Sequence, residues 1–354
     1  MVEYLSGNRI QGSSTLSESP PQTSWKVLGR SSAISSTATD IDVSITAKDN
    51  MMIFCNFITN STQVDSRLHF NDDGGSGGSS NYAWRIKNNN SSESDSDETY
   101  GFNTEEGYFK NAFQVYNVFS RSTLEKLITW HSVHDANASG SGTAPTKLEG
   151  AGKWVNTSSD ITKVSFTNID SGSYYAGSEV VIIGCDNDEA DSGTNFWEQL
   201  ADVTLTSATS TLDSGTISVK KYLKVRVHFP TGSGFEPDMR FNGSSANDYC
   251  TRFTGSPYSG GTGTNTSVNS DKINGYGGTA TTGTMFDFNI VNVSGNEKLV
   301  FGHIAYGASG AGNANDRREI VGKWDITNTA ITSIQFYSSG SIPVGTRITV
   351  WGAD

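Results

Sequence analysis

A block of sequence occurs twice in this 354-residue chain, and this repeat constrains the fold more than any other feature. The first copy spans residues 152–186 and the second spans residues 322–354, and both open with Gly-Lys-Trp. Matched positions within and before these blocks include Trp154 with Trp324, Phe166 with Phe336, Gly177 with Gly345, Tyr82 with Tyr249 and Trp25 with Trp197. Self-similarity over such a distance predicts two domains with one fold.

The repeated block has the pattern of β-strands. Polar and apolar residues alternate along 331–338 and 347–351, and many of them are β-branched or aromatic. Period-two alternation of such residues is typical of a half-buried strand. The intervening segment 339–345 is rich in Gly, Ser and Pro, which favour turns. Each block is therefore predicted to end in two strands joined by a short loop.

The rest of the chain extends this interpretation to two whole domains. We expect a docking arm at 1–23, a first β-sandwich at 24–186, an acidic linker at 187–195 and a second β-sandwich at 196–354. With 38 glycines and only 34% hydrophobic residues, the composition favours many short strands over long helices. About eight antiparallel strands in each copy indicate an all-β fold of two tandem duplicated sandwiches, jelly-roll-like in topology.

One local choice depends on comparing the copies. Residues 122–127 have helical propensity when taken alone. The matched segment 293–299 contains Gly295-Asn296, a turn signal, directly before an apolar strand pattern. Because two copies of one fold should share the element, we predict a turn followed by a strand in both.

Charge and composition exclude several classes of partner. The net charge of −12 argues against a nucleic-acid groove and against docking on anionic lipid. We expect no transmembrane helix, because there is no apolar run of eighteen residues, and no signal peptide. The spacing of Cys55, Cys185 and Cys250 suits neither a metal site nor a disulfide framework, so buried reduced thiols are expected.

The two copies differ most in one long connection. It lies between the strands near Arg85 and Phe113 in the first copy and is acidic, whereas its counterpart in the second copy is rich in Gly, Ser and Thr. Such a loop is either solvated surface or a contact surface for a glycan or a neighbouring subunit. The candidate contact residues are Tyr108, Tyr258 and Tyr276.

Candidate metal and catalytic residues are few. Asp186, Asp188 and Asp191 have the composition of a calcium loop without the EF-hand order. His131 and His134 would lie on opposite faces of a strand, so core histidines are the preferred interpretation over a metal site. No nucleophile elbow, phosphate loop or Cys/His pairing is present, and we expect no cofactor and no enzymatic activity.

Residues 1–23 lack any periodic pattern. Tyr4, Leu5 and Ile10 are apolar residues in a Gly/Ser-rich segment, and Pro20-Pro21 favours extended backbone at its exit. Two interpretations remain open, a frayed terminus and an extended arm that docks on a neighbouring subunit.

The ends of the chain carry a resemblance. Residues 4–14 followed by 20–25 resemble the opening of structural proteins from marine tailed viruses of bacteria and archaea. The closing residues 333–336 and 345–352 are similar to the last strands of virion β-sandwich modules, including tail and capsid-surface proteins. The resemblance implies a role in the virion and carries over no catalytic residue.

These observations lead to one functional expectation with two rivals. The chain is expected to be a non-enzymatic virion structural protein, made in the host cytoplasm, that assembles with itself and with other virion proteins, most simply as a trimer. The first rival is a carbohydrate-binding, lectin-like receptor-recognition module that uses the loop tyrosines. The second is a glycan-cleaving enzyme, which would need two carboxylates about 5–10 Å apart across a groove.

Overall fold

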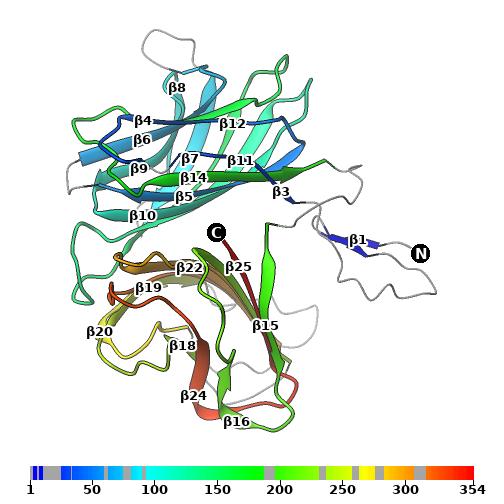
Figure 1. Ribbon diagram of the computed structural model, residues 1–354, viewed down its shortest axis with the longest axis vertical. Helices are drawn as coiled ribbons and strands as arrows, with labels where there is room; N and C mark the ends of the chain where they lie inside the picture. The colour runs from blue at the N-terminus through cyan, green and yellow to red at the C-terminus, as the bar shows by residue number, and fades with distance from the viewer. Residues whose placement is uncertain are drawn as a thin grey trace. The chain divides into compact units, whose positions relative to one another are not determined.

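The computed structural model describes residues 3–5, 8–10, 25–32, 34–59, 63–74, 81–89, 93–186, 196–230, 237–256, 263–275, 283–306 and 316–354. In these ranges every regular element is a β-strand and every strand pairing is antiparallel. The predicted all-β class is thus confirmed. The chain forms two compact units, 1–132 with 148–196 and 133–147 with 197–354 (Figure 1). The predicted linker, 187–195, lies outside the described residues.

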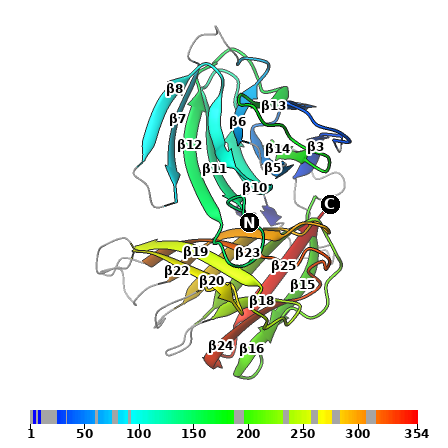
Figure 2. The same ribbon diagram turned by 90° about the vertical axis from the view of Figure 1, so that its left-hand side faces the viewer.

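The first unit is a sandwich of two sheets. Its larger sheet has the order β3-β14-β5-β10-β11-β12-β7-β8, and Figure 2 shows β8, β7, β12, β11 and β10 following one another across it. Its smaller sheet has the order β4-β13-β6-β9. The strands are β3 Lys26–Arg30, β4 Asp40–Ser44, β5 Asn50–Ile58, β6 Gln63–Phe70, β7 Tyr82–Asn88, β8 Ser94–Glu98, β9 Phe102–Tyr108, β10 Asn111–Phe119, β11 Lys126–His134, β12 Thr146–Trp154, β13 Lys163–Asn168 and β14 Glu179–Cys185.

Eight of these strands follow the jelly-roll order. The chain moves back and forth between the sheets, so that β3-β14-β5-β10 forms one layer and β4-β13-β6-β9 the other. The remaining strands are two hairpins, β7–β8 and β11–β12, which widen the larger sheet. Apolar side chains of both layers meet in one core, as Ile41 and Val43 of β4 do with Ile53 and Phe57 of β5. The predicted sandwich is therefore observed, with its core between the layers.

The second unit repeats this order. Its larger sheet is β15-β25-β17-β21-β22-β23-β19-β20, which matches the first unit strand for strand, and its smaller sheet is β16-β24-β18. The strands are β15 Glu198–Thr204, β16 Thr209–Asp213, β17 Tyr222–Phe229, β18 Asp238–Phe241, β19 Tyr249–Ser256, β20 Gly263–Ser270, β21 Thr284–Val291, β22 Lys298–Tyr306, β23 Asp316–Trp324, β24 Ile334–Ile342 and β25 Arg347–Ala353.

The counterpart of β9 in the second unit is a single bridge. Ile273 pairs with Met239 of β18, where Phe102 of β9 pairs with β6 in the first unit. Phe102 and Ile273 each lie against a glycine of the larger sheet, and the two glycines are at matched positions. A Cβ on Gly152 would lie 2.6 Å from the Phe102 ring, and one on Gly322 would lie 2.6 Å from Ile273. In both units a glycine on the larger sheet therefore leaves room for one apolar side chain from the opposite layer.

The matched tryptophans occupy equivalent buried positions. Trp154 stacks on Tyr82 with ring centroids 6.3 Å apart, and Trp324 stacks on Tyr249 at 6.1 Å. Both tryptophans are at most 2% exposed. Each tyrosine hydroxyl accepts a hydrogen bond from a backbone amide of the opposite layer, that of residue 70 at 2.9 Å in the first unit and of residue 241 at 3.0 Å in the second. These contacts join the two layers at the same place in both units.

A matched asparagine closes a loop in each unit. Asn71 and Asn242 both adopt a left-handed backbone conformation with φ of 53°, which asparagine tolerates better than most residues. The side-chain oxygen of Asn71 accepts bonds from the amides of 162–163 at 2.8 and 3.0 Å. That of Asn242 accepts the same bonds from 332–333 at 2.7 and 3.0 Å. The asparagine therefore replaces backbone pairing where β13 and β24 begin.

The turn predicted before Lys126 is confirmed. Residues 122–123 form a turn and β11 begins at Lys126, while β22 begins at the matched Lys298. Thr123 has φ of 75° and Gly295 has φ of 89°, and each donates its amide to a carbonyl of the loop after the Trp-bearing strand, at 3.0 and 2.8 Å. A positive φ cannot continue a right-handed helix, which explains why helical propensity failed here.

Candidate functional site

The predicted arm is described only in part. The backbone of β1 Glu3–Leu5 pairs with that of β2 Asn8–Ile10 as a small antiparallel hairpin, with Tyr4 opposite Arg9. The expected arm therefore contains a local hairpin where the sequence suggested no regular structure. The side chains of Tyr4, Leu5 and Ile10 lie outside the part of the chain that the structure describes, so docking by them stays a prediction.

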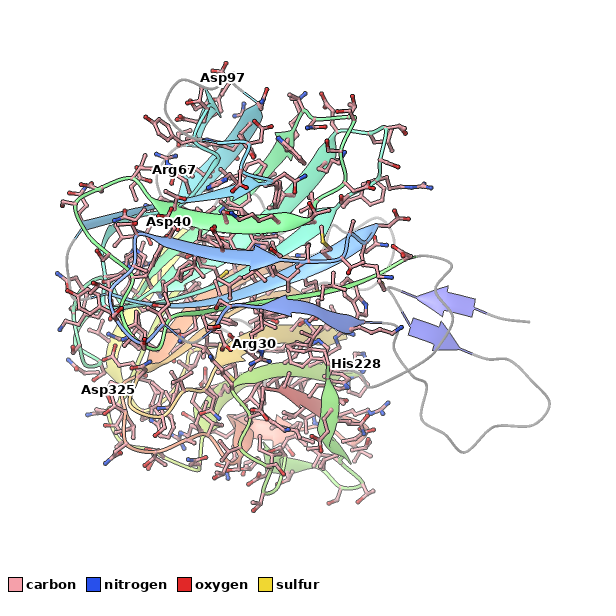
Figure 3. All side chains as sticks on the ribbon, turned by 45° about the horizontal axis from the view of Figure 1, so that its top comes forward. Arg30, Asp40, Arg67, Asp97, His228 and Asp325 are labelled. Atoms are coloured by element: carbon pink, nitrogen blue, oxygen red, sulfur yellow. The ribbon has the colours of Figure 1, made fainter. Side chains whose placement is uncertain are left out.

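The described part of the acidic connection of the first copy contains regular structure, which corrects its interpretation as a loop. It contains β8, which pairs with β7 at the edge of the larger sheet, and β9. Arg85 of β7 lies 3.4 Å from a Glu93 oxygen and 3.6 Å from an Asp95 oxygen, and all three side chains are exposed. Asp97 projects from the same edge (Figure 3). Charged edge strands oppose sheet-to-sheet aggregation, which is sufficient reason for this acidity.

The three tyrosines proposed as loop contacts are not brought together by any described contact. Tyr108 is the last residue of β9, and its side chain is not described. Tyr258 and Tyr276 lie outside the described residues. The glycan-binding rival therefore stays a prediction.

The calcium candidates do not assemble into a site within the described residues. Asp186 accepts a bond from the Lys48 ammonium at 3.0 Å and from the Asp49 amide at 2.9 Å. Asp354, at the same position of the second unit, binds Lys220 in the same way at 3.0 Å. Asp188 and Asp191 lie outside the described residues. Where the structure describes the chain, no group of three His, Cys, Asp or Glu side chains could hold a metal ion.

The three cysteines behave as expected from their spacing. Cys55, Cys185 and Cys250 are buried free thiols. Burial raises the pKa of Cys55, and burial also raises the pKa of Cys250 to about 12. Thiols held in this protonated state are poor nucleophiles.

The two histidines of the His-x-x-His-Asp stretch have separate environments. His131 on β11 is half-buried, whereas His134 at the end of β11 is buried. The Nδ1 atom of His134 accepts a hydrogen bond from the Ala136 amide at 3.0 Å, which requires the neutral ring with its proton on Nε2. Burial, together with the nearby Arg252 charge, lowers the pKa of His134 to about 3. His134 is thus a core histidine that favours the neutral form.

Acidification is expected to destabilise the unit that contains His134. A histidine whose folded-state pKa is depressed contributes its full stability above its ordinary pKa of 6.5 and loses it as the pH falls toward about 3. The loss is at most about 1.4 kcal/mol for each pH unit in that window. Unfolding free energies of the wild type and of His134→Gln, measured from about pH 7 to about pH 4, test this. The variant should show a shallower decline, and equal slopes would contradict the assignment.

The clearest functional arrangement is a segment held on the sheet of the second unit. Residues Val133–Lys147, here called the docked segment, belong to that unit together with 197–354. Its backbone is bound by side chains of β23 and of residues next to β22 and β23. The Ala138 carbonyl accepts from Lys323 at 2.6 Å, the Gly140 amide donates to Glu297 at 2.6 Å, and the Ser141 amide donates to Asp325 at 2.9 Å (Figure 3 labels Asp325).

Further bonds extend along the same segment. The Asn269 amide donates to the Ser141 carbonyl at 2.8 Å, Cys250 contacts the Thr143 carbonyl at 3.2 Å, and Arg252 donates to the Pro145 carbonyl at 2.9 Å. Nearly all of these bonds involve backbone atoms of the segment. Recognition through the backbone depends on close approach and little on side-chain identity, as in other cases of peptide recognition.

Buried ion pairs accompany these bonds. Lys147 lies 2.6 Å from Glu319 and Lys323 lies 3.2 Å from Glu297, and each of the four side chains is at most 7% exposed. Burial raises the pKa of Glu297, while the charge of Lys323 and the bond from Gly140 oppose that rise. Removing one partner of such a pair would leave an uncompensated charge away from water.

The first unit contains the matching ion pair, but there it is exposed to solvent. Lys153 and Glu125 match Lys323 and Glu297, and they lie 3.0 Å apart. Their side chains are 44% and 42% exposed. The alignment of the copies paired these residues but gave no sign that one pair is covered and the other is not.

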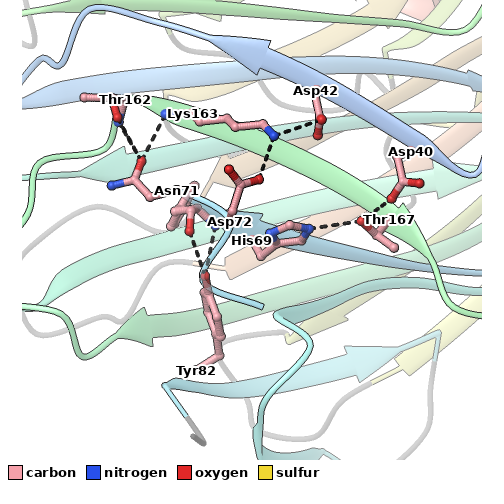
Figure 4. Close-up of polar contacts among 10 residues, drawn as sticks. Asp40, Asp42, His69, Asn71, Asp72, Tyr82, Thr162, Lys163 and Thr167 are labelled. Atoms are coloured by element: carbon pink, nitrogen blue, oxygen red, sulfur yellow. Dashed lines mark hydrogen bonds and ion pairs between the residues drawn. The ribbon is translucent and has the colours of Figure 1, made fainter. Parts of the chain in front are cut away.

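An array of polar side chains on the smaller sheet of the first unit was not predicted from the sequence (Figure 4). The Lys163 ammonium lies 2.9 Å from Asp42 and 2.6 Å from Asp72. Thr167 donates to Asp40 at 2.7 Å and therefore accepts from His69 Nε2 at 3.0 Å. Although burial alone would raise the pKa of Asp42, the neighbouring Ser165 and Lys163 side chains lower it.

This array links strands β4, β6 and β13 on one outer face and is not repeated in the second unit. Gly243 and Ser333 stand there where the first unit has Asp72 and Lys163. Burial lowers the pKa of His69, against the attraction of neighbouring aspartates, so its ring favours the neutral form. Each of these groups is engaged with a neighbour in the sheet, and we assign the array a structural role.

Among the described residues, no helix is long and apolar enough to cross a membrane. Comparison of the chain with known protein families found no match, and comparison with curated proteins found none either.

Proposed function

We propose that this chain is a non-enzymatic structural protein of a virion, which assembles with copies of itself and with other virion proteins. The docked segment is the observation that carries the proposal. A sheet face that holds a polypeptide by its backbone amides and carbonyls, with buried ion pairs alongside, is chemistry suited to binding protein chains. Such a face serves assembly.

The fold adds a weaker, associational argument. Jelly rolls occur in viral capsid and lectin domains, but a fold does not by itself determine a function. We also infer that the chain arose by duplication of one sandwich. The support is the common strand order, the matched Trp–Tyr stacks and the matched asparagines in the two units.

Assembly of the purified full-length chain tests the proposal. We expect light scattering and electron microscopy to find closed or extended assemblies whose abundance rises with protein concentration. A strict monomer at every concentration, combined with binding on a glycan array, would favour the carbohydrate-binding rival instead.

Deleting residues 1–23 is expected to leave the melting temperature unchanged but to prevent attachment to the particle. The deletion removes only the segment before the first matched residue, Trp25, so neither sandwich loses a strand. Co-sedimentation of full-length and truncated protein with the virion measures the attachment. Equal occupancy of the two proteins would show that the segment is only a tail.

A further inference from the structure

We propose that Glu125, Leu127 and Lys153, here called the acceptor face, bind residues 307–315 of a second copy of this chain. The inference rests on the proposed assembly function and names the partner and the surface. It concerns the first unit, whose larger sheet matches that of the second unit strand for strand.

The acceptor face has the same residue types as the face that holds the docked segment. Lys153 corresponds to Lys323, which donates to the Ala138 carbonyl at 2.6 Å. Glu125 corresponds to Glu297, which accepts from the Gly140 amide at 2.6 Å. A donor and an acceptor for a passing backbone are therefore present at matched places on both sheets.

The two faces differ in how far their side chains are exposed to solvent. Leu127 is 53% exposed, whereas the matched Leu299 is 0% exposed. The neighbouring Leu124 is also exposed, at 48%. Two exposed leucines therefore lie beside an exposed ion pair in the first unit, whereas the matched ion pair and Leu299 are covered in the second.

The internal repeat indicates which segment binds the acceptor face. The docked segment includes the connection between β11 and β12, 135–145, and the matched connection between β22 and β23 is 307–315, which lies outside the described residues. Both connections consist largely of small residues, Ala-Ser-Gly-Ser-Gly at 138–142 and Ala-Ser-Gly-Ala-Gly at 308–312. Because the docked segment is held through its backbone, small side chains that permit close approach are the shared requirement.

The acceptor face departs from its counterpart in two places. Val155 stands where Asp325 binds the Ser141 amide, and Ala83 stands where Cys250 contacts the Thr143 carbonyl. Fewer bonds predict a weaker contact. The docked segment also has a high effective concentration because it belongs to the same chain, whereas a second copy must be recruited from solution. We therefore expect a reversible, concentration-dependent contact.

The contact is heterologous, because the surface on one copy differs from the segment offered by the next. Such contacts generate rings when the rotation closes and open filaments when it does not. A ring of this kind is consistent with the predicted homo-oligomer.

Substitution at Leu127 tests the acceptor face. The variant Leu127→Asp changes an exposed residue, and Val219→Asp is the matched control, since Val219 is 54% exposed. Sedimentation velocity over a range of concentrations should show wild type and control assembling alike. Leu127→Asp, with an unchanged melting temperature, should need at least a tenfold higher concentration. Assembly of Leu127→Asp at the wild-type concentration would overturn the inference and leave the proposed function standing, whereas a monomeric wild type would overturn both.

Cross-linking tests the occupant. A chain carrying Leu127→Cys with Ala311→Cys should form disulfide-linked oligomers on mild oxidation, separable on a non-reducing gel. The control pair, Val219→Cys with Ala311→Cys, should give at least tenfold less linked product. Equal yields of linked product from the two pairs would show that 307–315 does not bind the acceptor face.

Discussion

Replacing Trp154 by alanine is expected to lower the free energy of unfolding of the first unit by about 3–5 kcal/mol, the range for large buried aromatic side chains. Trp154 is 0% exposed and stacks on Tyr82. Its indole nitrogen donates to Asp73 at 2.7 Å, so the substitution also removes one hydrogen bond from that carboxylate, which keeps the bond from Asn81 at 2.8 Å. Denaturant titration followed by circular dichroism measures the loss. A loss below about 1 kcal/mol would mean that the ring is not part of the core.

The second unit provides the matched comparison. Trp324 is 2% exposed and stacks on Tyr249 in the same way, so Trp324→Ala should also fall in the range of about 3–5 kcal/mol. In each case phenylalanine should recover part of the loss, because it refills most of the cavity. At Trp154 it also leaves the bond to Asp73 unrestored, whereas the indole nitrogen of Trp324 has no hydrogen-bond partner among the described residues. A severe effect in one unit and none in the other would contradict equivalent positions.

Replacing Lys323 by methionine is expected to cost about 3–5 kcal/mol, because it leaves the Glu297 carboxylate buried without its cation. The two side chains are 0% and 5% exposed, and Lys323 also binds the Ala138 carbonyl of the docked segment. Denaturant titration measures the cost, and limited proteolysis within 133–147 reports release of the segment. We expect both readouts to change together.

The matched control lies in the first unit. Lys153→Met removes the same residue from an ion pair whose side chains are 44% and 42% exposed, so it should cost at most about 1 kcal/mol. Adding Glu297→Gln to Lys323→Met should recover part of the larger loss, since no uncompensated charge then remains. Equal costs for Lys323→Met and Lys153→Met would show that burial does not distinguish the two pairs.

Much of the fold was predictable because its signals are local in the chain. Period-two alternation depends only on neighbouring residues, and it predicted the two strands that end each unit, although β24 runs on to Ile342 within the segment 339–345 that was expected to be a loop. The repeat supplied a second, independent copy of each element, which resolved the turn before Lys126 against its helical propensity. The strands in the acidic connection were not predicted, because they lack this local signal. Strands β8 and β9 carry few apolar residues, so no alternation marks them, and they are held by backbone pairing with β7 and β6.

The sequence alone determined the all-β class, the two sandwiches and the equivalence of Trp154 with Trp324. Only the tertiary structure decided which surface is covered. Glu125–Lys153 and Glu297–Lys323 are the same residues in the same local context, yet one pair is exposed and the other is buried. Solvent exposure is set by segments far apart in the chain, here by residues 138–141 bonding to side chains more than 100 positions later. No local pattern encodes that contact, because the docked segment is held mostly through its backbone, with side-chain bonds added by Ser141 and Lys147.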